Sequence, residues 1–452
     1  MKITIAGAGR VGTVIARSLI KENHDLIIVD SDRNNIDNIS NTLDVLAVLG
    51  DAASAELLLD AGVDESELMI AVTDSDVLNL FICIIARKVG VKNTIARIRE
   101  PIYSQTIALT KEDMGLSFIV NPERDAAKEI FSSLLFKDAG QVETFAKGNN
   151  EVMTCLIRDK NPAAGMMVRD FTKFVGRRIL ICALKRDSSV FIPNGNTVIQ
   201  PGDTMSFVAT RADAIHLFKK MKYEHGRISD LTIIGGGKLG YYLSHMALSN
   251  GIPVSIIERN PQICQKLVDT IPGATVMCGD ATDINVLEEC GVFKASAVVT
   301  ATDSDEKNVL ISMYIRKHFP DTKVITKVKK TDFEDMLYGI NLGDLYNPKY
   351  IAADRVITYV RAMQETVGNE VQSLCHVIDN KVEVLEFKID KAAPNIGKSL
   401  QEIRFRKDVL IAGITRNNES FIPGGSDTVE EGDTVLVITT RKGIGSFQEL
   451  FE

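Results

Sequence analysis

The chain repeats itself once, and this duplication limits the possible folds more than any other feature of the sequence. GAGRVG begins at Gly7 and GGGKLG at Gly235 (235 − 7 = 228). The tetrapeptide TDSD occurs at 73–76 and again at 302–305, and FIPNG at 191 is matched by FIPGG at 421. So many landmarks in one order indicate a unit of about 225 residues that is present twice, a period too long for a solenoid.

Each unit divides into two predicted parts. In the first copy, apolar runs such as KITIAGAG and DLIIVD alternate with helical patterns at 11–22, 32–42, 53–61 and 76–89. This alternation predicts an α/β fold, a Rossmann-like doubly wound parallel sheet. Residues 151–221 instead hold short strands, Gly/Pro turns and a closing helix near 212–221, which predicts a small α+β module. For the 452 residues we expect two Rossmann-like domains, each followed by such a module, at 1–140, 141–225, 228–368 and 369–452.

Two further segments have apolar residues at helical spacing, 123–136 and 349–363. They fit either the core of their own domain or an interface that pairs domains and responds to a ligand. The polar stretch DAGQVETFAKGNNE after the first segment predicts a domain boundary, and KYEHGRISD predicts a link to the second sheet.

Composition narrows the functional classes. The net charge of −8 argues against nucleic-acid binding, which usually needs a basic surplus. The seven cysteines are odd in number and scattered without a CxxC pair, which favours buried thiols in a reducing compartment over a metal-binding or redox role. The chain opens on a predicted strand, and its longest apolar stretch, 78–86, is about half a membrane span, so work at a membrane would need a partner.

The first glycine motif meets the context that a dinucleotide site requires. Gly7, Gly9 and Gly12 follow a predicted strand and open a helix, which suits a tight turn, a close approach to pyrophosphate, and helix–strand packing. Asp30 ends the next strand, where a carboxylate accepts ribose hydroxyls and repels a 2′-phosphate. This favours NAD over NADP, although Arg33 weakens the preference.

The remaining predicted residues of the first site follow the ends of successive strands, where open α/β sheets bind ligands. Together with the glycines and Asp30 they are Ala8, Arg10, Val11, Asp51, Ala52, Thr73, Asp74 and Arg97, with Arg97 placed to meet phosphate. Within TDSD, Asp74 or Ser75 is expected to cap the following helix. The alternative for the whole motif is a glycine turn with a purely architectural role.

The second copy predicts a related site. Its residues are Gly235, Gly236, Gly237, Lys238, Leu239, Gly240, Glu258, Asp280, Ala281, Thr302 and Lys327. Lys238 and Arg259 favour a more phosphorylated nucleotide such as ATP, and a duplicated site often changes its ligand.

The small modules offer no convincing catalytic group. A dehydrogenase needs a proton donor near its substrate, whereas His216 and Asp213 share one helix face and fit a surface pair or a packing histidine. GxSxG, HExxH and P-loop motifs are missing from the sequence. Nucleotide sites without chemistry predict a sensor. An NAD-dependent oxidoreductase with an unrecognised substrate and a free-standing nucleotide-responsive scaffold remain the alternatives.

The ordered motifs GAGRVG, DLIIVD, LGDA, TDSD and ARIREP, followed by the small module, resemble the RCK/KTN domain family over nearly the whole chain. The resemblance implies a non-enzymatic regulator that binds NAD(H), with ATP or ADP as further candidates. It implies docking on a membrane potassium-translocating subunit of a Trk-type system, hence a cytoplasmic protein on the inner membrane face. It also implies a homo-oligomer, a tetramer forming an eight-domain ring. Glu258 in place of Asp30 and Lys327 in place of Arg97 leave the second ligand open.

Overall fold

The computed structural model describes residues 1–103, 107, 114–135, 142–145, 150–187, 189–223, 228–329, 340, 342–364, 371–378, 381–391, 393–417 and 419–452. It forms two compact units, Met1–Ala126 with Asn347–Val360, and Ala127–Tyr346 with Arg361–Glu452. The four-domain division stays a prediction. Its boundaries at 140–141, 225 and 368–369 fall outside the described residues, as do residues 224–227 of the predicted link at 222–230.

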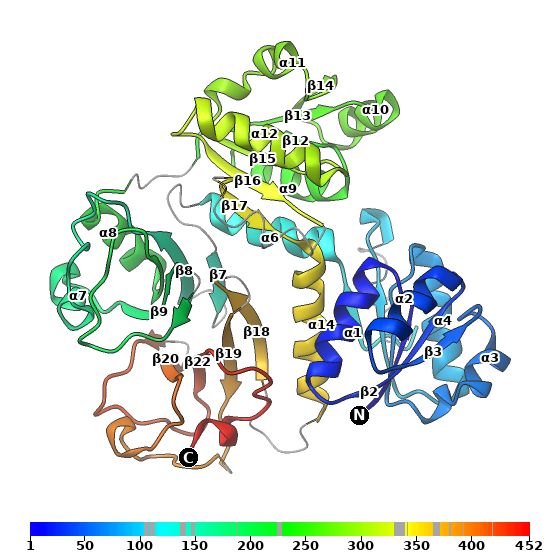
Figure 1. Cartoon of the computed structure of the whole chain (residues 1–452), viewed down its shortest axis with the longest axis horizontal. Coiled ribbons are helices and arrows are strands. Elements are labelled where there is room, and N and C mark those ends of the chain that lie inside the picture. Colours follow the sequence, from blue (N-terminus) through cyan, green and yellow to red (C-terminus); the bar gives the residue numbers. More distant parts are fainter. Residues whose placement is uncertain are drawn as a thin grey trace. The chain divides into compact units, whose positions relative to one another are not determined.

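The first sheet has six parallel strands in the order β3-β2-β1-β4-β5-β6. Figure 1 shows its first helices and strands, such as α1, β2 and α2, in blue. Its elements are β1 (Lys2–Ala6), α1 (Arg10–Lys21), β2 (Asp25–Asp30), α2 (Arg33–Thr42), β3 (Leu46–Leu49), α3 (Ala55–Asp60), β4 (Leu68–Ala71), α4 (Asp76–Val89), β5 (Asn93–Arg97) and β6 (Phe118–Val120). The predicted doubly wound sheet is confirmed, because the strand order reverses direction beside β1.

Apolar patterning explains these elements. Strand β4 is buried at every position, as expected of a central parallel strand covered on both faces. Helix α1 buries Val11, Ile15 and Leu19, which share one helix face. Ser75 begins α4 by accepting a hydrogen bond from the Leu78 amide.

The second sheet repeats this order as β14-β13-β12-β15-β16-β17, again with parallel pairing. Its elements are β12 (Leu231–Ile234), α9 (Lys238–Ser249), β13 (Val254–Glu258), α10 (Pro261–Thr270), β14 (Ala274–Cys278), α11 (Ile284–Glu289), β15 (Ala297–Thr300), α12 (Asp305–His318), β16 (Lys323–Lys327) and β17 (Asp344–Tyr346). The duplication seen in the sequence is therefore a duplication of topology.

The two long helices α6 (Pro122–Leu134) and α14 (Pro348–Gln364) each pack on the sheet of the other copy. The ring of Tyr359 on α14 stacks on Phe118 of β6, with centroids 5.3 Å apart, inside the first compact unit. Lys323 Nζ donates to the Ser133 carbonyl on α6 at 2.9 Å, inside the second unit. This exchange favours the domain-pairing interpretation of both segments over the intradomain one.

The two small modules have five-stranded sheets, in the orders β10-β9-β11-β8-β7 and β18-β19-β22-β20-β21, whose strand pairs are antiparallel. The first comprises β7 (Val142–Phe145), β8 (Asn150–Leu156), α7 (Val168–Val175), β9 (Leu180–Arg186), β10 (Ser189–Phe191), β11 (Thr204–Ala209) and α8 (Arg211–Lys220). The second comprises β18 (Val371–Val377), β19 (Val382–Lys388), η4 (Leu400–Glu402), β20 (Val409–Arg416), β21 (Glu419–Phe421), β22 (Thr434–Thr439) and η5 (Phe447–Leu450). Short 3₁₀ helices thus stand where the first module has α-helices.

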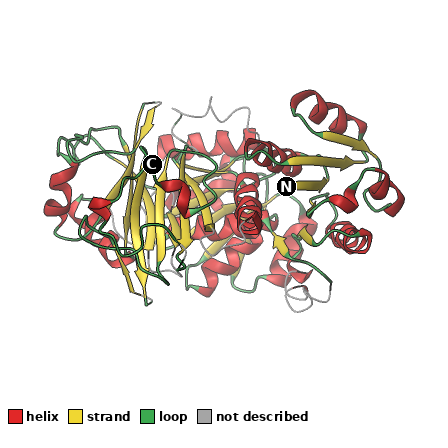
Figure 2. Ribbon diagram, turned by 90° about the horizontal axis from the view of Figure 1, so that it is seen from below, coloured by secondary structure: helices red, strands yellow, loops and turns green. Residues whose placement is uncertain are grey.

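These two modules share a core. Val152, Cys182 and Val208 of the first pack in one buried cluster with Val384 and Ile438 of the second. Figure 2 shows the strands of these sheets in yellow, with few helices, whereas helices flank the parallel sheets. Among the described residues, none of the helices has the length and apolar character that a membrane crossing demands.

The repeated FIP and GD motifs serve this fold. Arg186 forms an ion pair with buried Asp203 at 2.8 Å and places its guanidinium over the Phe191 ring. Arg416, Asp433 and Phe421 repeat that arrangement in the second module. These landmarks therefore maintain each module, and they do not indicate a ligand.

Candidate functional site

The first glycine turn has the backbone geometry that its motif predicts. Gly7 has φ +105°, and a Cβ there would lie 3.0 Å from the Thr73 amide nitrogen. A Cβ on Gly12 would overlap the Gly7 carbonyl oxygen, so helix α1 and strand β1 meet closely only without a side chain. At Gly9, no atom lies within 4 Å of a Cβ position. The turn is thus closed toward the sheet and open at its middle glycine.

The second turn repeats this geometry. Gly235 has φ +113°, and a Cβ there would lie 2.8 Å from the Thr302 amide nitrogen. A Cβ on Gly240 would overlap the Gly235 carbonyl, whereas the Cβ position of Gly237 is open. Gly9 and Gly237 are the N-cap residues that precede α1 and α9. Because glycine has no side chain, no cap side chain accepts a hydrogen bond from the first amides of either helix.

Each predicted ribose acid also holds its own glycine turn. Asp30 accepts hydrogen bonds from the Ala8 amide at 2.6 Å and the Asp32 amide at 2.8 Å. Glu258 does the same for Gly236 and Asn260, both at 2.8 Å. A carboxylate accepts about four hydrogen bonds, so both acids keep acceptor capacity beyond these amides. Sequence reasoning predicted the ribose contact alone and missed this loop-holding role.

The turns after β3 and β14 lie beside these acids, because Gly50 and Gly279 donate their amides to the carbonyls of Asp30 and Glu258, both at 2.9 Å. Asp51 is exposed and accepts from the Ala53 amide at 2.9 Å, and Ala52 is buried. Ala281 is likewise buried. The predicted residues of this turn are therefore brought next to the acid in both copies.

Asp280 differs from Asp51 in its charge environment. The amide and hydroxyl of Thr282 hydrogen-bond its carboxylate, and Lys307 Nζ lies 3.1 Å from Oδ2. The Thr282 bonds, followed by the Lys307 bond, lower the pKa of Asp280 to about 2. Leu78 occupies the corresponding place on α4, so the first copy has no ammonium at this position.

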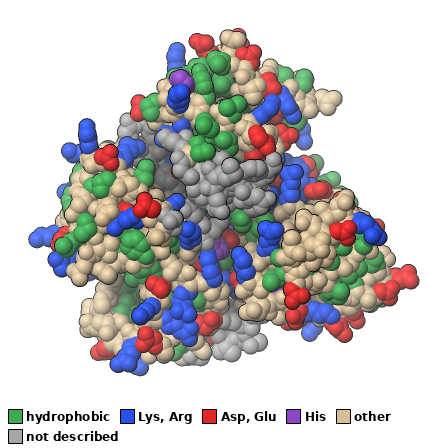
Figure 3. Space-filling view, viewed as in Figure 1, with side chains coloured by type: hydrophobic (Ala, Val, Ile, Leu, Met, Phe, Trp, Pro, Cys, Tyr) green, Lys and Arg blue, Asp and Glu red, His purple; other side chains and the backbone are tan. Residues whose placement is uncertain are grey.

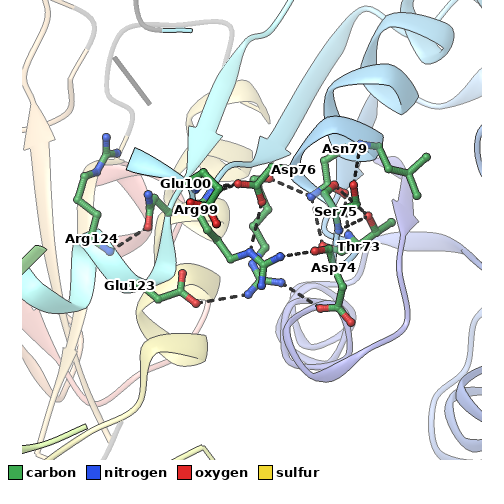
Figure 4. A network of polar contacts seen from close by, with 12 residues as sticks. Thr73, Asp74, Ser75, Asp76, Asn79, Arg99, Glu100, Glu123 and Arg124 are labelled. Atoms are coloured by element: carbon green, nitrogen blue, oxygen red, sulfur yellow. Dashed lines mark hydrogen bonds and ion pairs between the residues drawn. The ribbon is translucent and has the colours of Figure 1, made fainter. Parts of the chain in front are cut away.

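Buried asparagines tie the strand ends together, and sequence reasoning did not place them in the site. Asn79 Oδ1 accepts from the Thr73 amide at 2.8 Å and from the Thr73 hydroxyl at 2.7 Å (Figure 4). Its Nδ2 donates to the Arg97 carbonyl at 2.9 Å. Asn308 makes the same three contacts with Thr302 and Lys327. The matched spacing of each asparagine after TDSD was the available signal.

The residues of the TDSD turn have different structural roles. Ser75 and Ser304 are the helix caps, which decides between the two predicted candidates. Buried Asp76 accepts from the amides of Arg99 and Glu100, both at 2.8 Å, and so joins α4 to the chain after β5 (Figure 4). The side chain of Asp74 is exposed.

Arg97 and Lys327 occupy equivalent strand ends in different ways. The Arg97 guanidinium lies 3.7 Å from Asp74 and 3.6 Å from Glu123 of α6, and burial lowers its pKa. Lys327 Nζ donates to the Ala301 carbonyl at 2.7 Å. Both cations are buried near the turn, and their contact with phosphate stays a prediction.

Some of the other predicted residues are buried in the core, and others are exposed to solvent. Val11 and Leu239 are buried and anchor their helices, so only their backbones face the turn. Arg10 is exposed and Lys238 half-buried at the first helical position. His216 contacts the Val175 carbonyl at 3.0 Å, which makes it a packing residue of its module.

The cysteines depart from expectation at two positions. Five of the seven are buried as predicted, but Cys278 is exposed and Cys290 half-buried. Within the described part of the chain, His, Cys, Asp and Glu side chains are not gathered in groups of three or more that could hold a metal ion.

Family comparisons match both halves of the chain. The TrkA-N domain matches residues 3–122 and 231–357, and the TrkA-C domain matches 152–222 and 384–452. Among solved structures, the GsuK channel bound to NAD has a TM-score of 0.63 at 18% identity, covering 98% of this chain and 77% of that chain. GsuK bound to ADP has a TM-score of 0.51 at 16% identity, covering 80% and 70%. At these identities the structures show a common fold.

Full-length relatives also match. The Trk system potassium uptake protein TrkA homolog of Archaeoglobus fulgidus is 31% identical, covering 100% of both chains. The Trk system potassium uptake protein TrkA of Haemophilus influenzae is 25% identical, covering 100% of this chain and 99% of its own. The chain therefore belongs to the TrkA family, with two TrkA-N domains that are each followed by a TrkA-C domain.

Proposed function

We propose that this chain is a non-enzymatic, nucleotide-sensing regulatory subunit that docks on the membrane subunit of a Trk-type potassium-uptake system and gates it. The observation that carries the proposal is the repeated combination of an open glycine turn and an acid that holds it. Full-length relatives are named as Trk potassium uptake proteins, which supports the choice of transport system.

NAD(H) is the proposed ligand of the first site. Gly9 leaves room for a pyrophosphate at the start of α1, where uncapped amides attract anions. Asp30 also accepts from the Asn35 side-chain amide at 3.4 Å, a long bond that a ribose hydroxyl would replace, and its charge opposes a 2′-phosphate. A structural relative carries NAD, which agrees with this choice.

ATP or ADP is the proposed ligand of the second site, with NAD(H) as its competitor. The turn of the second copy has the same open glycine, but cations differ around it. Lys238 begins α9 as Arg10 begins α1, but Arg259 directly follows Glu258, where Ser31 follows Asp30, and it lies 3.9 Å from Asp303. A cation directly beside the acid suits a ligand with terminal phosphates. A structural relative bound to ADP supports this class.

We also propose that the chain assembles with copies of itself, as a tetramer with an eight-domain ring. Helix α4 exposes Val77 (60%), Phe81 (51%) and Ile84 (40%), which share one helix face, and α12 exposes Leu310 (62%) and Met313 (42%) at the corresponding places. Figure 3 shows hydrophobic side chains reaching the surface over the second Rossmann sheet, where α12 lies. A second copy of the chain is the occupant that would cover both faces.

Calorimetry on matched variants tests the nucleotide sites. Asp30→Ala removes the ribose acceptor and the anchor of Ala8, so NADH affinity at the first site should fall about 10–100-fold. Glu258→Ala should lower affinity only at the second site. Unchanged NADH affinity in Asp30→Ala would remove the first-site assignment.

Co-purification with the membrane subunit tests the regulatory role. We expect the chain to be recovered with a potassium-translocating subunit, in an amount or state that changes when NADH or ATP is added, and its deletion to reduce potassium uptake. Steady turnover of NADH with any member of a substrate panel would favour an oxidoreductase instead. Normal potassium uptake after deletion would favour a free-standing scaffold.

A further inference from the structure

Two cysteine side chains meet beside the second glycine turn. Cys264 lies in the first turn of α10, and Cys278 is the last residue of β14. Both adjoin Glu258, because Cys264 Sγ donates to the Glu258 carbonyl at 3.2 Å and Cys278 pairs with Glu258 across the parallel ladder. The Glu258 carbonyl also accepts from the amide of Gly279, the neighbour of Cys278, at 2.9 Å. Neighbouring strands are about 4.8 Å apart, which agrees with this close approach.

The two thiols differ in access. Cys278 is exposed, whereas Cys264 is buried. Burial first, and then the hydrogen bond and charge of Cys278, raise the pKa of Cys264 to about 12. An oxidant from solution therefore reaches Cys278 first, and Cys264 is positioned to react only with whatever forms there.

The first copy has neither thiol. Ile36 stands at the place of Cys264 and Leu49 at the place of Cys278, each at the same position relative to the preceding acid or the following GD turn. The pair therefore distinguishes the second nucleotide site from the first, inside one chain and on one fold.

We propose that Cys264 and Cys278 form a reversible intramolecular disulfide when the protein meets a hydroperoxide. In the first step the Cys278 thiol loses its proton and its sulfur attacks a peroxide oxygen, giving a sulfenic acid and, for hydrogen peroxide, one water. In the second step the Cys264 sulfur attacks that sulfenic sulfur and a second water leaves with the Cys264 proton. The two thiols are oxidised by two electrons, and the peroxide is reduced to two waters.

The disulfide would act on the nucleotide site through Glu258, and this part rests on the proposed function. A bonded pair needs a sulfur–sulfur distance near 2.0 Å and a defined torsion. Forming it draws the start of α10 toward the end of β14, and both lie beside the end of the strand that carries Glu258. Because Glu258 holds the Gly236 amide at 2.8 Å, the oxidised protein should bind nucleotide more weakly at this site.

Peptide mapping of the full chain tests the disulfide without any nucleotide. Trypsin releases NPQICQK, which contains Cys264, but the next fragment holds both Cys278 and Cys290, so the experiment uses Cys290→Ser. After hydrogen peroxide and thiol alkylation, we expect a cross-linked pair of these fragments that dithiothreitol separates. Sulfinic acid at Cys278 with Cys264 still alkylated would overturn the proposal.

Two variants provide the controls. Cys264→Ser should leave a sulfenic acid at Cys278 that dimedone traps, because the resolving thiol is gone. Cys264→Ile with Cys278→Leu carries the residues of the first copy and should give neither product. Equal dimedone labelling with and without Cys264 would contradict the assigned order of attack.

Calorimetry separates the disulfide from its effect. In an Asp30→Ala background, ATP and NADH should bind the oxidised second site about tenfold more weakly than the reduced site, which corresponds to one charge-assisted hydrogen bond. Equal affinities in the presence of a mapped disulfide would overturn the coupling to Glu258. If the reduced protein gave no binding heat with ATP or NADH, the proposed function of the second site would be contradicted. The mapped disulfide would be unaffected by that result.

Discussion

The two TrkA-N halves agree in their backbone contacts and differ in their charges. In both, an acid at the end of the second strand holds a glycine-turn amide, and an asparagine joins the threonine after the fourth strand to the end of the fifth. The cation at that end differs. Arg97 lies between two carboxylates, and Lys327 donates to a carbonyl.

The interiors differ as well. In the second half, buried Thr300, Ser312 and Thr326 form a chain of hydroxyls, with 3.0 Å between Thr300 and Ser312 and 2.7 Å between Ser312 and Thr326. Ala71, Cys83 and Ala96 take these places in the first half, where they are part of an apolar core. One backbone plan therefore tolerates different interiors and charges, provided that the contacts that shape the turn are kept.

Among the substitutions that test this comparison, replacing Arg361 should lower the free energy of unfolding most. Arg361 pairs with Glu383 at 3.4 Å, and both side chains are 2% exposed. Leu135 stands as far after Pro122 as Arg361 does after Pro348. Arg361→Leu strands a buried carboxylate beside His376, so the free energy of unfolding should fall by about 3–5 kcal/mol. Urea unfolding followed by circular dichroism measures this, since the chain lacks tryptophan.

The matched double variant Arg361→Leu with Glu383→Gln removes both charges and should recover most of that loss. A single-variant loss below about 1 kcal/mol would mean that the pair behaves like an exposed one.

Replacing the buried asparagines tests whether the two halves are equivalent. Asn79→Ala and Asn308→Ala each leave a threonine amide and a strand-end carbonyl without their partner, which should cost about 2–4 kcal/mol for two unpaired groups. Equal losses in urea unfolding would show that the shared contact carries equal weight. A difference above about 1 kcal/mol would show that Arg97 or Lys327 compensates in one half.

Periodicity and motif spacing predicted the doubly wound sheets, the glycine turns and the helix at 76–89 because each depends on local backbone geometry. The sequence did not predict the hydrogen bonds by which Asp30 and Glu258 hold their glycine turns, because a carboxylate at that position also fits the role of a ribose acceptor. The exchange of α6 and α14 also escaped a firm prediction. Their apolar faces show that each helix is covered, but sequence spacing does not say by which sheet.

The pH dependence of stability tests the same comparison in the small modules, where each sheet carries a buried glutamate, Glu151 or Glu383. Glu151 stands opposite Ala209 as Glu383 stands opposite Thr439. Burial raises the pKa of Glu151 against the opposing effect of Arg211, whereas His376 and Arg361 outweigh burial and lower the pKa of Glu383. A raised carboxyl pKa gives stability that is present below the unfolded value and is lost as pH rises through the folded one.

Glu151→Gln should therefore gain stability relative to the parent between pH 5 and 8, by less than about 2 kcal/mol, and the difference should shrink at pH 4. Glu383→Gln should show the opposite trend, because its stabilising charge is lost as pH falls. Denaturation midpoints at three pH values measure both, and parallel pH profiles would contradict the assignment.

The smallest expected effect concerns Lys307, the ammonium that the first half replaces with Leu78. Thr282 contributes more than Lys307 to the low pKa of Asp280, about 2, so Lys307→Leu should raise that pKa only part of the way to its ordinary value. The pair is half-exposed, with side-chain exposures of 34% and 47%, so stability at neutral pH should change by less than about 1 kcal/mol. Carboxyl NMR titration of Asp280 measures the shift. The Thr282 amide bond, the largest cause of the low pKa, is kept in Lys307→Leu, so the pKa should stay below its ordinary value in this variant. If Lys307→Leu restores the ordinary pKa, the ammonium and not the turn controls Asp280, and the two halves differ at this place by a charge that matters to a bound nucleotide.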